Sequence, residues 1–230
     1  MNDSTLKGIF KDAAEEFGIE VLKAEFQPFK DLKVRWQRCA HEISFTVTDY
    51  LQEAPEEIVM ELARTLLIKI YRDPEEMYSD VFTEWVTSNK FVRLNRDTYL
   101  QRSNALPEDF ESKHHDLQKT YEGLVSSGII EEIPGLALRW TKDRKTNPLG
   151  VSSALMRTVI MPIGMDSSDI AYDVFEFNLF QLLTNIGMDF KLQPLERKEL
   201  ADNMIASYPD SERLMDAIEK QRELATYGAI

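Results

Sequence analysis

The spacing of apolar and polar residues predicts a mostly helical first half of the chain. Cap-forming residues at Asp3-Ser4-Thr5 open a helix that runs to Phe17 and ends at Gly18. Apolar residues recur every fourth position from Ile58 to Ile70, after a proline and two acids, which is typical of a helix with one buried stripe. Between them, Ile43–Thr48 alternates apolar and polar residues and predicts a short strand. Two further helices are predicted, over 73–88 and from 109 or 112 to 127.

The pattern changes after residue 130. Residues 131–150 are rich in turn formers, and the short apolar segments 136–141 and 157–163 predict antiparallel strands. Pro162 cannot donate a ladder hydrogen bond, so the strand 157–163 should end there or lie at a sheet edge. A long apolar helix, Ile170–Ile186, follows and should end at Gly187. Two last helices are predicted over 194–207 and 210–226.

These elements predict an α+β fold with two regions. Residues 1–130 should form a helical N-terminal region, and residues 131–230 a core with a small antiparallel sheet, a buried helix and C-terminal helices. The two regions are expected to pack as one unit, and no internal repeat is visible in the sequence.

The segment from about Leu138 to Leu214 resembles the SprT-like domain of zincin metalloproteases, the compact gluzincin type. The resemblance rests on four successive segments, Leu138–Trp140, Leu149-Gly150, Val159–Ile163 and Ile170 onward. It extends to an apolar register along the last of these, at Val174, Phe177, Phe180, Leu183 and Ile186 after Met165-Asp166. In this register Gln181 stands at the first zinc histidine, Leu182 at the catalytic glutamate and Asn185 at the second histidine. Arg197 stands near a further ligand position.

The resemblance implies a zincin-like (minigluzincin) helix core without zinc chemistry. Gln181-Leu182-Leu183-Thr184-Asn185 replaces H-E-x-x-H. Zinc hydrolysis needs about three nitrogen, sulfur or carboxylate ligands and a general base beside the bound water. Neutral amides are poor zinc ligands, Leu182 cannot take up a proton, and all three histidines precede residue 116. We therefore expect a pseudoenzyme with no catalytic residue, no metal and no cofactor, in which Gln181, Leu182, Asn185 and Arg197 mark a vestigial site.

The resemblance also implies where a partner would bind. Zincins hold an extended peptide along the edge strand beside the active-site helix, so a protein or peptide partner is expected at the strand 157–163. The groove residues would be Trp140, Arg157, Val159 and Met161, although Trp140 also fits a place in the core. Two other functions stay open. One is an enzyme with a metal-dependent site around His41, His114 and His115, and the other is an acidic structural or interaction protein.

The remaining candidate residues favour structural roles. His41-Glu42 lacks a second histidine at Phe45, and the adjacent His114 and His115 would point about 100° apart on a helix, as a solvated pair. Cys39 is expected to be a small buried thiol. Three aspartates near the start of the apolar helix could chelate calcium but lack an EF-hand pattern, so helix capping explains them better: Asp166, Asp169 and Asp173.

The charge and composition of the chain limit the classes of partner that we expect. The net charge is −13 and basic residues are scattered among more numerous acids, which disfavours nucleic acid. No apolar run approaches the roughly 20 residues that span a bilayer, and the N-terminal residues have no signal-peptide pattern. With a single cysteine, Cys39, we expect a soluble cytoplasmic protein without disulfides. The sequence leaves the oligomeric state open.

Overall fold

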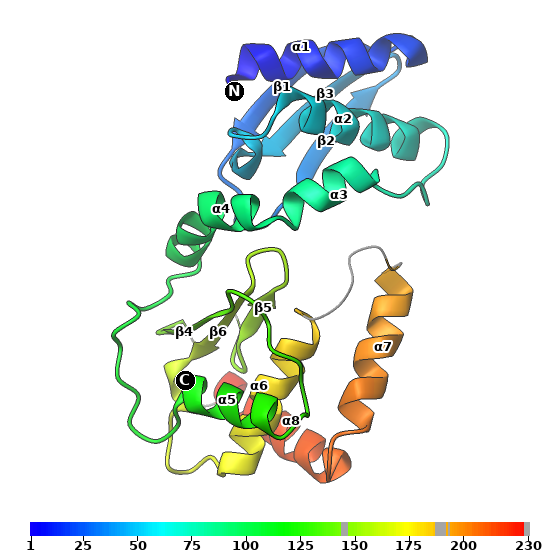
Figure 1. The fold of residues 1–230 in the computed structure, drawn as a ribbon. Helices are drawn as coiled ribbons and strands as arrows, with labels where there is room; N and C mark the ends of the chain where they lie inside the picture. Colours follow the sequence, from blue (N-terminus) through cyan, green and yellow to red (C-terminus); the bar gives the residue numbers. More distant parts are fainter. Residues whose placement is uncertain (144–146, 187–191, 193, 228–230) are drawn as a thin grey trace. The chain divides into compact units, whose positions relative to one another are not determined.

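The structure, a computed structural model, describes residues 1–143, 147–186, 192 and 194–227 (Figure 1). The chain divides into two compact units, Met1–Tyr99 and Leu100–Ile230, and each is described by itself. The first unit contains α1 (Asp3–Ala14), η1 (Glu15–Phe17), β1 (Glu20–Gln27), β2 (Val34–Cys39), β3 (Glu42–Thr48), η2 (Asp49–Leu51), α2 (Glu56–Tyr71), α3 (Asp80–Val86) and α4 (Asn89–Arg102), whose last residues belong to the second.

The sheet of the first unit has the strand order β1-β3-β2, with β1 parallel and β2 antiparallel to β3. Its central strand alternates, so that Ile43, Phe45 and Val47 are buried on one face. Helix α1 covers that face, and the rings of Phe10 and Phe45 lie 4.4 Å apart. On the opposite face of β3, Ser44 and Thr46 are half-buried and only Thr48, at the end of the strand, is buried. We call this less covered face the open face.

The second unit contains α5 (Leu117–Ser126), β4 (Ala137–Thr141), β5 (Val151–Ser153), β6 (Thr158–Pro162), η3 (Ile163–Met165), α6 (Tyr172–Thr184), α7 (Pro194–Ala206) and α8 (Ser211–Tyr227). Its sheet has the order β4-β6-β5, with β4 parallel and β5 antiparallel to β6. Helix α6 forms the centre of the core, where Phe175, Phe177 and Leu179 are fully buried.

Both units are built on one topology. Each runs helix, strand, two further strands, 3₁₀ turn, helix, and in each the third strand is central, parallel to the first and antiparallel to the second. The second helix of each unit starts after an extended residue without a side-chain cap, Pro55 for α2 and Ala171 for α6. The chain therefore contains a structural repeat that its sequence does not reveal, because matching strands differ in length and exposure.

The expected α+β class is correct, with eight α-helices and two three-stranded sheets among the described residues. The helix from Asp3, the strand 43–48 and the helix after Pro55 are confirmed. The region 1–130, expected to be mostly helical with one strand, contains five α-helices among its described elements, and two further strands, β1 and β2, complete a sheet with β3 there. Neither strand alternates clearly: β1 carries charges on the open face of the sheet, and most of β2 is exposed on both faces. The contact division at Tyr99 also differs from the expected boundary at 130.

Two helix starts also shift toward better caps. The helix predicted from residue 73 begins at Asp80, where the Ser79 hydroxyl accepts the Phe82 N–H at 3.3 Å. The helix predicted from 109 or 112 begins at Leu117, where the Asp116 carboxylate accepts two backbone N–H groups. Among the described residues no helix is both long and apolar enough to cross a membrane.

The sheet of the second unit corrects a further expectation, since it is mixed rather than antiparallel. Strand β6 is central and lies between β4 and β5, although Pro162 had suggested an edge. The proline is tolerated because it is the last residue of β6, opposite Thr141, where a missing N–H interrupts no further ladder.

Candidate functional site

The candidate site lies at the C-terminal half of α6, next to the edge strand β5. The buried side of the helix packs into the core of the second unit, and the Asn178 amide donates a 2.7 Å hydrogen bond to the Leu149 carbonyl oxygen. This buried bond connects α6 to the residue before Gly150, at the start of β5. The predicted Gly187 cap of the helix lies outside the described residues.

Leu182, which the family resemblance aligns with the catalytic glutamate, packs against Gly150. Gly150 has a φ of +107°, and a Cβ placed there would lie 3.0 Å from Leu182 Cδ1 and 2.9 Å from the Ile160 carbonyl oxygen. Because the backbone approaches so closely, only glycine fits this position. The aliphatic side chain of Leu182 thus occupies the space next to Gly150.

The two amides of the vestigial set lie one helical turn apart, as their spacing requires. Gln181 donates from its side-chain nitrogen to the Met215 sulfur on α8 at 2.9 Å. Asn185 is exposed and donates to the Gln181 carbonyl oxygen at 3.4 Å. Arg197 lies half-buried on a separate helix, α7. The amides bind helix atoms and a thioether, which makes them helix-packing and capping groups in this structure.

The outer face of α6 is closed by the C-terminal segment. The Tyr208 ring lies 4.7 Å from the Phe180 ring, and its hydroxyl donates to the Glu176 carboxylate at 2.7 Å. Burial, and then this hydrogen bond to Glu176, raises the pKa of Tyr208. One turn earlier, the Arg213 guanidinium lies 2.6 Å from the Asp173 carboxylate and lowers the pKa of Asp173.

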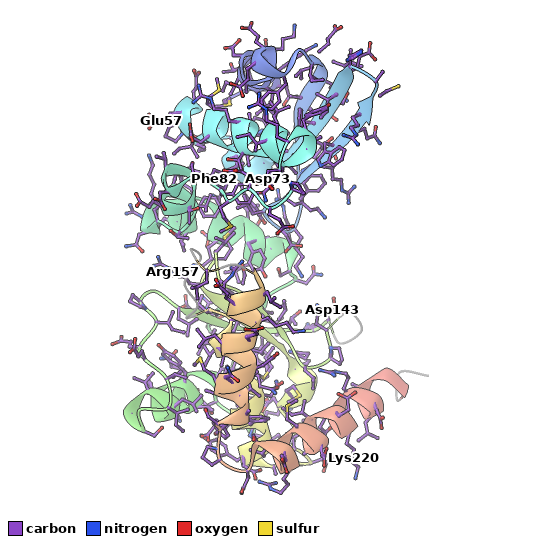
Figure 2. The ribbon with its side chains drawn as sticks, turned by 90° about the vertical axis from the view of Figure 1, so that its right-hand side faces the viewer. Glu57, Asp73, Phe82, Asp143, Arg157 and Lys220 are labelled. Carbon is purple, nitrogen blue, oxygen red and sulfur yellow. The ribbon has the colours of Figure 1, made fainter. Side chains whose placement is uncertain are left out.

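The peptide groove predicted along 157–163 is not formed. Val159 and Met161 are fully buried, and the backbone of β6 pairs with strands on both sides. Trp140 is also buried and stacks on Phe175 with ring centroids 6.1 Å apart, as its alternative place in the core predicted. Arg157 (Figure 2) lies in the turn before β6 with a φ of +46° and donates to the Pro134 carbonyl oxygen at 3.3 Å. Strand β6 is the central strand, with β4 along residues 158–162 and β5 beside residues 158–160, so it is not the edge strand that the predicted groove requires.

His115 is buried, so the expectation of a solvated histidine pair is wrong for this residue. Its ring stacks on Phe175 at 4.5 Å. Its Nε2 lies 3.1 Å from the Ser167 carbonyl oxygen and 3.0 Å from the Ile170 carbonyl oxygen. Two acceptors around one nitrogen require the proton on Nε2, which is then a hydrogen-bond donor. The ring fastens the start of α6 to the segment before α5.

Asp166 completes this connection between distant segments. Its carboxylate accepts the backbone N–H groups of Lys113 at 2.7 Å, His114 at 2.7 Å and His115 at 2.9 Å. Partial burial alone would raise the pKa of Asp166, but the three backbone donors outweigh it and lower the pKa. The carboxylate is used as a structural hydrogen-bond acceptor.

The other candidate ligands are dispersed. Asp169 is exposed, Asp173 pairs with Arg213, and His41 is exposed in the turn between β2 and β3 of the first unit. Among the described residues, no three histidine, cysteine, aspartate or glutamate side chains gather as a metal site. Cys39 is exposed at the end of β2, and the expected buried thiol is wrong because this strand is uncovered on both faces.

Sequence reasoning missed a second surface, on the first unit. We call it the β2 edge surface and define it as residues 33–39, the strand β2 with Lys33 before it. All of its side chains are exposed except that of Val34, which is half-buried, and Trp36 is 44% exposed. The available signal was the segment 30–38 (KDLKVRWQR), with four basic residues and one acid in a chain of net charge −13.

The cations of this surface lie close to aromatic rings. Lys33 and Arg35 each lie 4.9 Å from the Phe29 ring centroid. Arg38 lies 5.9 Å from the Trp36 ring, and its guanidinium donates to the Ile70 carbonyl oxygen at the end of α2. Among the described residues, none of these three cations forms an ion pair with a carboxylate.

Comparison with known proteins gave no match to a family model, to a curated protein or to a solved structure.

Proposed function

We propose that this protein is a binding module for protein or peptide segments, with a SprT-like, zincin-type arrangement around α6 that does not carry out zinc hydrolysis. The proposal has two parts, a closed position where hydrolysis would occur and an open strand edge where a partner can bind.

The observation that carries the first part is the contact between Leu182 and Gly150. In a zinc hydrolase the corresponding space beside the edge strand must hold a general base and a metal-bound water. Here the leucine side chain occupies it, and the flanking amides Gln181 and Asn185 donate hydrogen bonds to protein atoms. Neutral amide groups supply neither the charge nor the basicity that the reaction needs.

The second part is supported by the β2 edge surface. Edge strands expose unpaired backbone groups that can accept another strand, and proteins normally shorten, cover or blunt them. Strand β2 is six residues long and exposed, with a half-exposed tryptophan and cations that have no carboxylate partner among the described residues. Strand addition at such an edge is a common mode of peptide recognition.

The metal part is tested by zinc binding to the full chain. We expect equilibrium dialysis with zinc to show no stoichiometric site, and no change in the Gln181→Ala/Asn185→Ala variant. His114→Ala is the matched control, since His114 is the exposed member of the histidine pair. Stoichiometric zinc that the α6 double variant abolishes would refute a metal-free α6, and loss in the His114 variant would favour the metal-dependent alternative.

The binding part is tested with a displayed library of random linear peptides. We expect enrichment of binders on the full chain relative to an unrelated acidic protein of similar net charge. Equal enrichment on both proteins would mean that no binding module is present.

A further inference from the structure

The geometry points to one class of partner for the β2 edge surface, which is an extended segment that alternates acidic and apolar residues and adds to β2 as a fourth strand. This inference deepens the proposed function and rests on it. It follows from which backbone groups, which cations and which apolar side chains β2 presents.

The free backbone groups of β2 belong to every second residue. Thr48 N–H donates to the Lys33 carbonyl oxygen at 3.1 Å, so the facing pair Lys33 and Thr48 is a hydrogen-bonded pair. In an antiparallel ladder such pairs alternate with pairs whose N–H and C=O groups point away from the partner strand. The register Val34↔Val47, Trp36↔Phe45 then directs the backbone groups of residues 34, 36 and 38 to the open side.

The other edges are less accessible. Beside β4, Leu106 N–H donates to the Trp140 carbonyl oxygen at 2.7 Å, which covers that edge. Strand β5 has only three residues, and β1 contains a register shift and donates its Phe26 N–H to the Asp3 carboxylate. Among the described strands, β2 therefore offers the longest regular run of outward backbone groups.

The two faces of β2 differ in chemistry. Trp36 faces the same side as the buried Phe45, and Val34 the same side as the buried Val47. Lys33 and Arg35 lie on the opposite, open face, where both cations approach the Phe29 ring. A strand placed beside β2 alternates its own side chains in the same way, so apolar residues meet Val34 and Trp36 while acids meet Lys33 and Arg35.

Charge favours an acidic segment over nucleic acid. The cations of the β2 edge surface stand out in a chain of net charge −13, whose overall field repels a long polyanion. A short peptide with three or four carboxylates gains local charge-assisted contacts and also uses the outward N–H and C=O groups, which a nucleic acid backbone cannot pair in register.

Basic residues on an edge can also serve only to prevent self-association, and the experiment must separate that role from docking. The probe is a fluorescein-labelled, acetylated octapeptide that alternates glutamate and valine, titrated against the full chain by anisotropy. Three comparison probes are a lysine–valine octapeptide, a glutamate–valine octapeptide with its four acids contiguous, and a twelve-residue oligothymidylate.

We expect saturable binding of the alternating acidic peptide, and binding weaker by about tenfold for each of the comparison probes. If the alternating peptide does not bind, the basic residues of β2 serve only to prevent self-association, and the inference is overturned. Equal binding of the contiguous-acid peptide would show charge attraction without strand addition, and stronger binding of the oligothymidylate would assign the surface to nucleic acid; either result also overturns it.

A pair of methylated peptides tests the strand geometry without changing the protein. One carries N-methyl groups at the glutamates and the other at the valines, so only one of them loses the N–H groups that face β2. A slip by one residue would move the acids from the face of Lys33 and Arg35 to the face of Val34, Trp36 and Arg38, where they would meet one cation instead of two. We expect the two affinities to differ by about tenfold; equal affinities would exclude a strand in register.

Protein variants locate the site. Arg35→Glu should weaken binding by about tenfold, whereas Lys220→Glu, the same charge change on the exposed side of α8 (Figure 2), should change it less than about twofold. Val34→Pro removes an outward N–H of β2 and leaves the hydrogen bonds between β2 and β3 intact. If Val34→Pro does not fold, Trp36→Ala is the variant used in its place. Unchanged binding in Arg35→Glu would overturn the inference, while library peptides that bind regardless of this variant would leave the proposed function standing at another surface.

Discussion

Asp166→Asn is the substitution that best tests how the second unit is held together. The Asp166 carboxylate accepts three backbone N–H groups, from Lys113 on one oxygen and from His114 and His115 on the other. Asparagine has nearly the same shape but only one acceptor oxygen, so its NH₂ group must face at least one of these donors. The substitution removes a charge and creates a donor–donor contact without opening a cavity.

The expected loss of stability follows from the number of hydrogen bonds that asparagine cannot accept. One hydrogen bond to a charged acceptor contributes about 1.5–3 kcal/mol to stability. Asp166 is half-buried, so water can replace part of the lost bond, and we expect Asp166→Asn to lower the free energy of unfolding by about 1–2 kcal/mol at pH 7. Asp169→Asn is the matched control, because Asp169 is exposed, and should change stability by less than about 0.5 kcal/mol.

The stability that the Asp166 carboxylate contributes should depend on pH. The folded-state pKa of Asp166 is lowered, so the carboxylate stabilises the fold fully above its ordinary pKa, and this stabilisation is lost as the pH falls through the lower folded-state value. The difference between wild type and Asp166→Asn should therefore be largest at pH 5–7 and should shrink below about pH 4.

Urea unfolding is the assay, in a Trp36→Phe/Trp85→Phe background in which Trp140 reports on the second unit alone. Trp140 is 6% exposed, so its emission should change when that unit unfolds. A stability difference of zero at pH 7, or one that is the same at pH 3 and pH 7, would refute the argument that the Asp166 charge fastens these segments.

Three other predictions concern the surroundings of α6. Gly150→Ala should destabilise the protein by at least about 2 kcal/mol in the same urea assay, since its φ is +107° and its Cβ would contact backbone; a neutral effect would mean that the space beside β5 is open. Tyr208→Phe should cost about 1 kcal/mol through the lost hydrogen bond to Glu176, and no loss would show that water replaces it fully. Arg213→Ala should raise the pKa of Asp173 toward its ordinary value in a carbon-detected NMR titration, and an unchanged pKa would contradict the ion pair.

Periodicity identified the elements whose two sides differ most. The stripe Ile58–Ile70 and the alternation in 43–48 have one buried and one exposed side, so the pattern determines both type and position. Strands β1 and β2 were not detected because β1 has only two buried residues, Val21 and Ala24, which do not alternate, and the exposed strand VRWQRC has no hydrophobic alternation. Their existence depends on pairing with β3, which is a tertiary effect.

The candidate site was predictable in part for a similar reason. That Gln181, Leu182 and Asn185 share one helix follows from spacing, but the contact of Leu182 with Gly150 depends on how α6 lies on the sheet. The prediction that β6 could be an edge strand was wrong because Pro162 is compatible with two positions, an edge strand or the last residue of a central strand. The sequence does not distinguish between them, since strand order is set by the tertiary fold. The role of His115 was also hidden, since its acceptors, Ser167 and Ile170, lie more than fifty residues away.

The structural repeat suggests why the two units offer such different edges. In each unit the second strand is antiparallel to the central strand and forms an edge, β2 in the first and β5 in the second. Strand β5 is three residues long and begins beside Gly150, where Leu182 fills the space under the chain. Strand β2 is twice as long, and its outward backbone groups lie between an exposed Trp36 and cations that form no ion pair within the described part of the chain. Because one topology produces both edges, the difference lies in side chains and strand length, and this difference is the reason why we propose β2, and not β5, as the edge that accepts a partner strand.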